Sequence, residues 1–74
     1  MADVQTRVMV EVNGKGEQVA AETVAALLAE KGIDAGGRGI AVALNGAVVP
    51  RARWAETILR QGDTVEIVHA KQGG

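Results

Sequence analysis

Two Asn-Gly pairs constrain the fold more than any other feature of this sequence, because each directly follows a valine-rich or apolar segment. Asparagine and glycine both tolerate positive φ angles, so such a pair favours the two-residue turn of a β-hairpin. Before Asn13-Gly14, residues 7–12 alternate so that their valines share one face, which predicts a strand. Residues 17–20 are predicted to return antiparallel to it.

The second pair, Asn45-Gly46, predicts another tight turn. Residues 40–44 before it form a nearly continuous apolar strand, and residues 47–50 after it are predicted to form a short one. Because proline has no backbone N–H to donate, Pro50 confines this short strand to an edge or an end of the sheet. Side chains at every second position of residues 64–70 again share one face, and this alternation predicts the last strand.

Residues 24–31 predict the main helix, since their apolar side chains recur on one face that would press on the sheet. These side chains are Val24, Leu27 and Leu28. Glu22 or Thr23 is expected to open the helix, and Gly32 stands where a left-handed C-terminal cap belongs.

Residues 52–59 are predicted to form a helical turn or an irregular segment with three large side chains pointing inward. These are Trp54, Ile58 and Leu59. Trp54 is the sole aromatic residue, and a core position is favoured over a partner contact because large aromatic side chains dominate small cores. Its neighbours Arg51 and Arg53 form either a solvated charge pair or a contact with an acidic partner surface.

The predicted order of elements is strand, strand, helix, strand, short strand, strand. The first and last strands are rich in Val and Ile, so we expect them to lie centrally and parallel to each other, with the helix covering one face. This is an α+β chain of the β-grasp (ubiquitin-like) type, with a mixed sheet of roughly four to five strands. At 74 residues the chain makes one small domain, which we assign to residues 1–70, followed by a flexible tail at 71–74.

On this arrangement, the sheet face opposite the helix would carry apolar side chains from several strands. These are Met9, Ala41, Ala43 and Val68. An open apolar face on a small domain indicates a docking patch for a partner protein. The alternative is the ordinary hydrophobicity of a protein surface.

Composition excludes several classes of partner. Eight basic and nine acidic residues leave no basic excess for phosphate contacts with a nucleic acid. No apolar run approaches the length of a membrane span, and the first residues lack the layout of a signal peptide. Cysteine is absent, so neither disulfides nor thiol chemistry are expected. We therefore expect a cytoplasmic protein with no nucleic-acid or membrane partner.

Side chains suited to catalysis are scarce. The sequence has one histidine and neither serine nor cysteine, so a nucleophile–base pair is not expected. His69 is interpreted as structural or solvent-facing, and Asp63 as part of a turn. The glycine-rich residues 36–39 lack the strand–helix context of a phosphate-binding loop. We expect a carrier that is not an enzyme and that binds no metal or cofactor itself.

The sequence ends in Gly73-Gly74, shortly after an apolar segment. A tip without side chains can enter a narrow channel in another protein, and residues 70–74 would extend about 15–18 Å. A carboxylate is a poor electrophile, so we expect a partner to activate it as an acyl-adenylate made with ATP, while the carrier supplies positioning. The alternative is an ordinary glycine-rich linker.

The sequence resembles the ThiS family, the sulfur carriers of thiamine thiazole synthesis. The resemblance rests on Val12-Asn13-Gly14, on Val42 to Arg51, on Trp54, and on Leu59 through Gly62-Asp63 to Gln72-Gly73-Gly74. It implies a β-grasp fold and a Gly74 carboxylate that a ThiF-like enzyme adenylates with ATP. The carboxylate would become a thiocarboxylate with sulfur from a donor protein and then give that sulfur to thiazole synthase (ThiG). Gln72 and Gly73 would belong to the threaded tail.

The sequence departs from the family at Ala52, where serine is frequent, and at Lys71, where an apolar residue is common. The small subunit of molybdopterin synthase (MoaD) is an alternative that shares the fold and the Gly-Gly end, although its tail tends to carry aromatic residues and proline. A ubiquitin-like modifier that joins Gly74 to target lysines is another, because an amine can also attack an acyl-adenylate. The remaining alternative is a plain interaction domain whose tail has no function.

Overall fold

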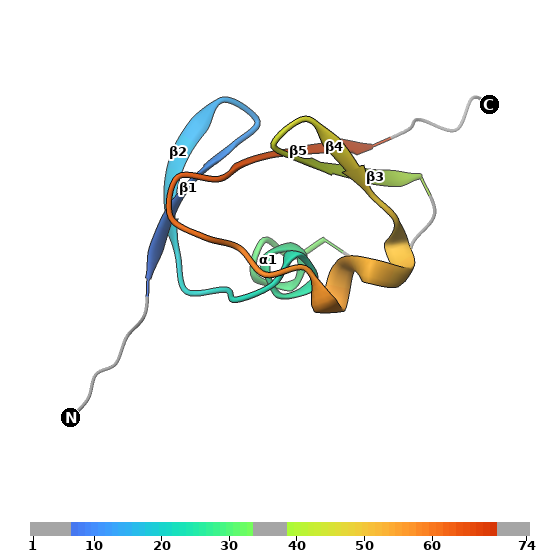
Figure 1. Ribbon diagram of the computed structural model, residues 1–74, viewed down its shortest axis with the longest axis horizontal. Coiled ribbons are helices and arrows are strands. Elements are labelled where there is room, and N and C mark those ends of the chain that lie inside the picture. Colours follow the sequence, from blue (N-terminus) through green and yellow to red (C-terminus); the bar gives the residue numbers. More distant parts are fainter. Residues whose placement is uncertain (1–6, 34–38, 70–74) are drawn as a thin grey trace.

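A computed structural model describes residues 7–33 and 39–69, and it shows a five-stranded mixed sheet with one α-helix packed on one face (Figure 1). The elements are β1 (Val8–Val12), β2 (Lys15–Val19), α1 (Val24–Glu30), β3 (Ile40–Leu44), β4 (Ala47–Val49), the 3₁₀-helix η1 (Arg51–Glu56) and β5 (Thr64–His69). The strands lie in the order β2-β1-β5-β3-β4. β1 and β5 are parallel, and the other neighbours are antiparallel. The predicted β-grasp arrangement is confirmed, with β5 at the centre.

Both Asn-Gly pairs make the predicted tight turns. Asn13 and Asn45 each have a φ angle of 51°, followed by 85° at Gly14 and 88° at Gly46. Two successive positive φ angles match the right-handed twist of the flanking strands. β2 begins directly after the first turn, at Lys15, so it starts earlier than the predicted residue 17.

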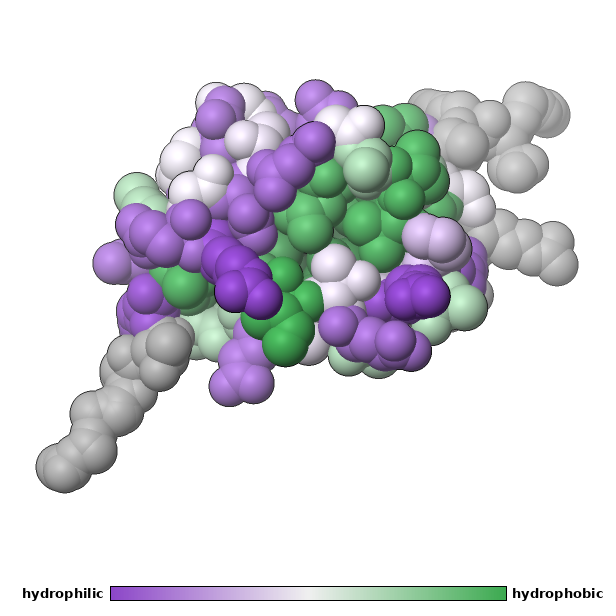
Figure 2. Space-filling model, viewed as in Figure 1, coloured by the Kyte–Doolittle hydropathy of each residue, from purple (hydrophilic) through white to green (hydrophobic). Residues whose placement is uncertain are grey.

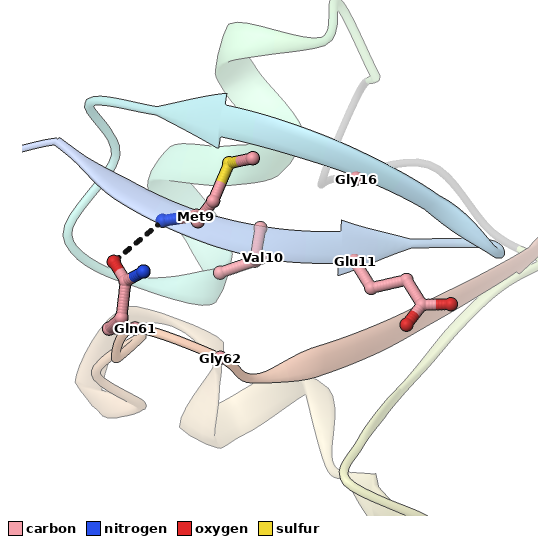
Figure 3. Close-up of a pocket in the computed structure, with 6 residues that line it drawn as sticks. All are labelled: Met9, Val10, Glu11, Gly16, Gln61 and Gly62. Carbon is pink, nitrogen blue, oxygen red and sulfur yellow. Dashed lines mark hydrogen bonds between the residues drawn. The ribbon is translucent and has the colours of Figure 1, made fainter.

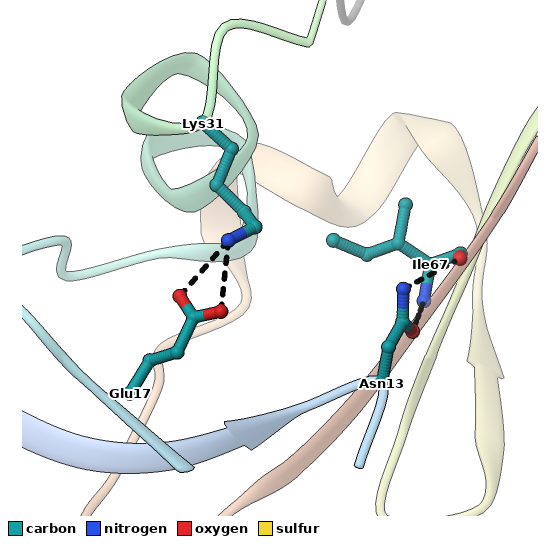
Figure 4. Close-up of polar contacts among 4 residues, drawn as sticks. All are labelled: Asn13, Glu17, Lys31 and Ile67. Atoms are coloured by element: carbon teal, nitrogen blue, oxygen red, sulfur yellow. Dashed lines mark hydrogen bonds and ion pairs between the residues drawn. The ribbon is translucent and has the colours of Figure 1, made fainter. Parts of the chain in front are cut away.

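The turn asparagines also bind the central strand. The Asn13 side chain accepts a hydrogen bond from the Ile67 N–H at 2.7 Å and donates one to the Ile67 carbonyl at 3.2 Å (Figure 4). The Asn45 Oδ1 accepts one from the Thr64 N–H at 2.9 Å. The register of β1 with β5 covers two residue pairs, so the amide of Asn13 extends this pairing beyond the end of β1. The sequence predicted the turns but not these bonds.

The helix begins and ends where its capping residues require. The Thr23 hydroxyl accepts a hydrogen bond from the Ala26 N–H at 3.1 Å, which satisfies a free helix donor. At the other end, Gly32 has a φ angle of 77°. The N–H groups of Gly32 and Ile33 bond to the carbonyls of Ala29 and Leu28, which is a Schellman motif. Beyond the helix, the Lys31 ammonium lies 2.9 and 3.0 Å from the two Glu17 carboxylate oxygens of β2 (Figure 4).

The core lies between the helix and the inner face of the sheet. Its buried members are Val10, Val12, Val19, Val24, Leu27, Leu28, Val42, Val49, Trp54, Leu59, Val65 and Ile67. Trp54 is 3% exposed, and its Nε1–H donates to the Val49 carbonyl at 2.8 Å. The predicted core position of Trp54 is therefore confirmed, and its one polar group has a partner.

The core position predicted for one residue, Ile58, is wrong. Ile58 is 55% exposed, whereas Leu59 is buried. The helical turn ends at Glu56, and Ile58 then forms an isolated antiparallel bridge with Thr23. Successive side chains of an extended segment point to opposite sides, so only one of the two neighbours faces the core.

Among the residues that the structure describes, no helix combines the length and the apolar character needed to cross a membrane. The expected tail, residues 71–74, lies outside the described residues, as does most of the glycine-rich segment at 36–39.

Candidate functional site

The sheet face that α1 leaves uncovered is the candidate interaction site, and we call it the open face. It consists of the strand positions that alternate with the buried ones. These are Met9, Glu11, Gly16, Gln18, Ala41, Ala43, Val48, Thr64, Glu66 and Val68. All of the predicted apolar docking residues on the sheet belong to this set.

Four small apolar residues of the open face lie together, and we call them the apolar patch. The patch consists of Ala41, Ala43, Val48 and Val68. Ala41 pairs with Val68, and Ala43 pairs with Val48 across neighbouring strands. Val48 is 75% exposed and Val68 is 57% exposed. Figure 2 shows hydrophobic residues gathered over the region of β3, β4 and β5.

Sequence reasoning missed Val48. The signal was present, because Val48 and Val49 are consecutive in a short strand and must face opposite sides of the sheet. Val49 is buried, which leaves Val48 on the open face.

Met9 is on the same face but belongs to a different feature. It lines a hollow of about 330 Å³ at the β1–β2 side of the sheet, with the turn that precedes β5 along one side (Figure 3). The lining residues are Met9, Val10, Glu11, Gly16, Gln61 and Gly62. Figure 3 shows the Met9 side chain leaning toward β2 and the Glu11 side chain pointing toward β5. The open face therefore has two parts, the apolar patch and this hollow.

The turn beside the hollow is fixed to β1. The Gln61 Oε1 accepts a hydrogen bond from the Met9 N–H at 3.0 Å. The Gly62 N–H donates to the Met9 carbonyl at 2.8 Å. Both backbone groups of Met9 are thus held by the turn, so the side of the hollow is formed by the fold itself.

The charges of the open face are acidic. Within the described strands, Glu11 and Glu66 are its ionisable side chains, and both are exposed. The salt bridges that the structure describes join Lys31 to Glu17 and Arg53 to Glu56, so neither of the two open-face carboxylates takes part in one. A partner that docks on this face would complement it best if its own surface carried basic and apolar groups.

Arg51 and Arg53 do not lie on the open face. They belong to η1, which lies beside α1 (Figure 1). The Arg51 guanidinium lies 5.3 Å from the centroid of the Trp54 ring, and an Arg53 nitrogen lies 4.0 Å from a Glu56 carboxylate oxygen. The two predicted groups of docking residues are therefore on different sides of the molecule.

The residues weighed for catalysis have structural or solvent-facing positions. His69 is exposed at the end of β5. The Asp63 carboxylate accepts hydrogen bonds from the Arg60 N–H at 2.8 Å and from the Asn45 amide at 3.0 Å, which confirms its role in a turn. Within residues 7–33 and 39–69, no three His, Asp or Glu side chains are grouped so that they could hold a metal ion.

Gln72, Gly73 and Gly74 lie outside the described residues. The structure does describe the strand that leads toward them. β5 is paired with β3 as far as His69, whose partner is Ile40. The chain before the tail is therefore held on one side up to this residue, and the open face flanks it.

The comparisons with known proteins agree with the fold. The sequence model of the ThiS family matches residues 10–74. A crystal structure of a thiamine biosynthesis protein (ThiS) from Geobacter metallireducens is similar, with 34% sequence identity and a TM-score of 0.74. That match covers 90% of this chain and 100% of the other. Among curated proteins, none matches the chain in sequence.

Proposed function

We propose that this chain, which belongs to the ThiS family, is a sulfur carrier in thiamine biosynthesis whose reactive group is the carboxylate of Gly74. The observation that carries the proposal is the extent of the family match. It runs from residue 10 through the Gln72-Gly73-Gly74 tail, so it includes the group that would be loaded. The similar crystal structure bears a thiamine biosynthesis name as well.

The chemistry begins with activation. A carboxylate oxygen of Gly74 attacks the α-phosphorus of ATP, pyrophosphate leaves, and an acyl-adenylate forms. ATP would be bound by a ThiF-like enzyme, and this chain would be its protein substrate with no cofactor of its own. The carrier contributes position, because a tail fixed to a folded body turns the encounter with the nucleotide into a local one.

Loading and delivery follow. Hydrosulfide released by a donor protein attacks the acyl carbon, displaces AMP and loses its proton, which leaves a thiocarboxylate on Gly74. Thiazole synthase (ThiG) would accept that sulfur, and an oxygen atom from water or from the sulfur acceptor would replace it on the acyl carbon, which regenerates the carboxylate for another cycle. The same tail must therefore reach two different active sites.

The division of the chain suits this cycle. β5 is tied to both neighbours and to the two turn asparagines, so the folded body holds the strand that precedes the tail. Gln72 and Gly73 would thread a narrow channel, and glycine permits the close approach of surrounding groups. The apolar patch and Met9 would dock on each partner in turn, because they flank the strand that carries the tail.

Intact mass spectrometry tests the proposal. The protein is incubated with ATP, a ThiF-like enzyme and a sulfur donor, and the mass is expected to rise by the difference between one sulfur and one oxygen atom. Fragmentation should locate the change at Gly74. An unchanged mass, with partners that load a known carrier in parallel, would refute the proposal.

A matched variant sharpens the experiment. Gly74→Ala adds one methyl group at the tip and changes none of the described core residues, so the thermal unfolding temperature should not change. We expect its thiocarboxylate yield to fall because the narrow channel rejects the added carbon. An undiminished yield would remove the argument from the channel while leaving the carrier role intact.

A further inference from the structure

Gly16 differs from every other glycine in the described part of the chain. Gly14, Gly32, Gly39, Gly46 and Gly62 all have φ angles between 77° and 88°, where other residues are strained. Gly16 has no such angle, and it lies inside β2. A Cβ atom built on Gly16 would meet one described atom within 4 Å, the Met9 methyl carbon at 4.0 Å, which is an ordinary contact.

Neither the backbone nor the packing of the described residues therefore requires glycine at position 16. A glycine inside a strand lowers stability, and such a residue often marks a place where another molecule comes close. The absence of a side chain here has one visible consequence. Gly16 lines the hollow of about 330 Å³ on the open face (Figure 3), and a larger residue would fill part of it.

The chemistry of the hollow indicates its occupant. Gly16 and the Met9 side chain offer an apolar surface, and Glu11, which also lines the hollow, points its side chain toward β5 (Figure 3). None of the six lining residues is basic, and no described salt bridge involves Glu11. A long side chain with an aliphatic stem and a positive end matches this combination, since Lys and Arg bury their stems and keep their charges at polar groups.

We infer that the hollow receives a lysine or arginine side chain of the enzyme that activates Gly74. The stem lies over Gly16 beside Met9, and the cationic end pairs with Glu11. The inference rests on the proposed function, because it names one contact through which the activating enzyme holds this carrier. It adds a charged anchor to a docking face on which the apolar patch supplies hydrophobic contact.

The first experiment fills the hollow and reads two quantities. Threonine favours strands, so Gly16→Thr should raise the thermal unfolding temperature by roughly 3–6 °C. The same variant should raise the KM of the activating enzyme for the carrier by about tenfold, with kcat unchanged, because the loss of a binding contact acts on association. Gln18→Thr is the matched control, since it places the same residue at the next open-face position of β2, which does not line the hollow.

A variant that is more stable and yet has a higher KM is a result that a merely structural glycine would not give. If Gly16→Thr leaves KM within twofold of the unmodified protein, the hollow has no occupant in this complex and the inference is overturned. The unmodified protein is assayed first. Its failure to be adenylated would refute the proposed function, and with it the contact, before any variant is compared.

The second experiment tests the charge. Glu11→Gln keeps the size of the side chain and should raise KM by about three- to tenfold, while Glu30→Gln, an exposed change at the end of α1, should not. Salt screens such a pair, so the KM of the unmodified protein should rise between about 50 and 300 mM salt more steeply than that of Glu11→Gln. Equal KM values, or equal salt slopes, would mean that the occupant is not a basic side chain and would overturn the assignment.

Discussion

The two faces of the sheet differ in the side chains they carry and in how far those side chains are buried. The inner face carries valine and isoleucine side chains that are almost fully buried beneath α1 and η1. The open face carries small apolar side chains, two carboxylates and a strand glycine, and most of these positions are exposed. Packing selects the residues of the inner face, because every methyl group there contributes to stability.

Packing does not explain the open face. Exposed valines such as Val48 and Val68 contribute little to the core, and Gly16 in a strand lowers stability. A residue that does not serve the fold can serve an interaction. The contrast therefore separates positions whose substitution should unfold the chain from positions whose substitution should disturb only the docking of a partner.

The largest expected effect on stability comes from a substitution in the core. Leu27 is fully buried, and Leu27→Ala should lower the free energy of unfolding by about 3 kcal/mol, because it removes apolar contacts and leaves a cavity. Urea denaturation of the two proteins measures the difference. A loss below about 1 kcal/mol would show that the helix contributes less to this core than its burial indicates.

An intermediate effect is expected where a turn is tied to the central strand. Asn13→Gly keeps a residue that adopts a positive φ angle but removes both side-chain bonds to Ile67. The free energy of unfolding should fall by about 1–2 kcal/mol, since the Ile67 backbone groups lose their partners. Hydrogen exchange at the Ile67 amide should accelerate as well. An unchanged exchange rate at the Ile67 amide would mean that water takes the place of the asparagine amide without loss of stability.

The smallest effect on stability is expected on the open face. Val68→Ser should change the free energy of unfolding by no more than about 0.5 kcal/mol, and yet raise the KM of the activating enzyme by about fivefold. Ile58→Ser is the matched control, since Ile58 is 55% exposed and Val68 is 57% exposed. Ile58 lies beside Thr23, near the helix. Equal KM values for the two variants would show that the open face is not the docking face.

Much of the fold was predictable because its signals are local. The Asn-Gly turns, the alternation of valines in β1 and the caps at Thr23 and Gly32 all depend on neighbouring residues, and each was confirmed. The position of Trp54 was also predictable from its size. Ile58 was placed wrongly because the end of η1 decides which of two adjacent apolar residues turns inward, and the sequence does not mark that end.

The candidate site was predictable only in part. Ala41, Ala43 and Val68 were assigned to the open face from alternation, and β5 was placed centrally from its composition. Val48 was overlooked. Arg51 and Arg53 were considered as possible partner contacts beside Trp54, and the structure places them on another side of the molecule from the open face. Proximity in sequence to Trp54 says nothing about which side of the sheet an arginine occupies.

By itself, the sequence determined the elements, their order, the identity of the buried faces and the glycine tail, because steric preferences of the backbone and hydrophobic alternation act over a few residues. Only the tertiary structure decided what those elements bring together. The bonds from Met9 to Gln61 and from Asn13 to Ile67 join residues 52 and 54 positions apart. The composition of β1 and β5 predicted that the two strands lie parallel, but no local preference encodes which residues of the two segments meet. The hollow over Gly16 arises at the same place and for the same reason.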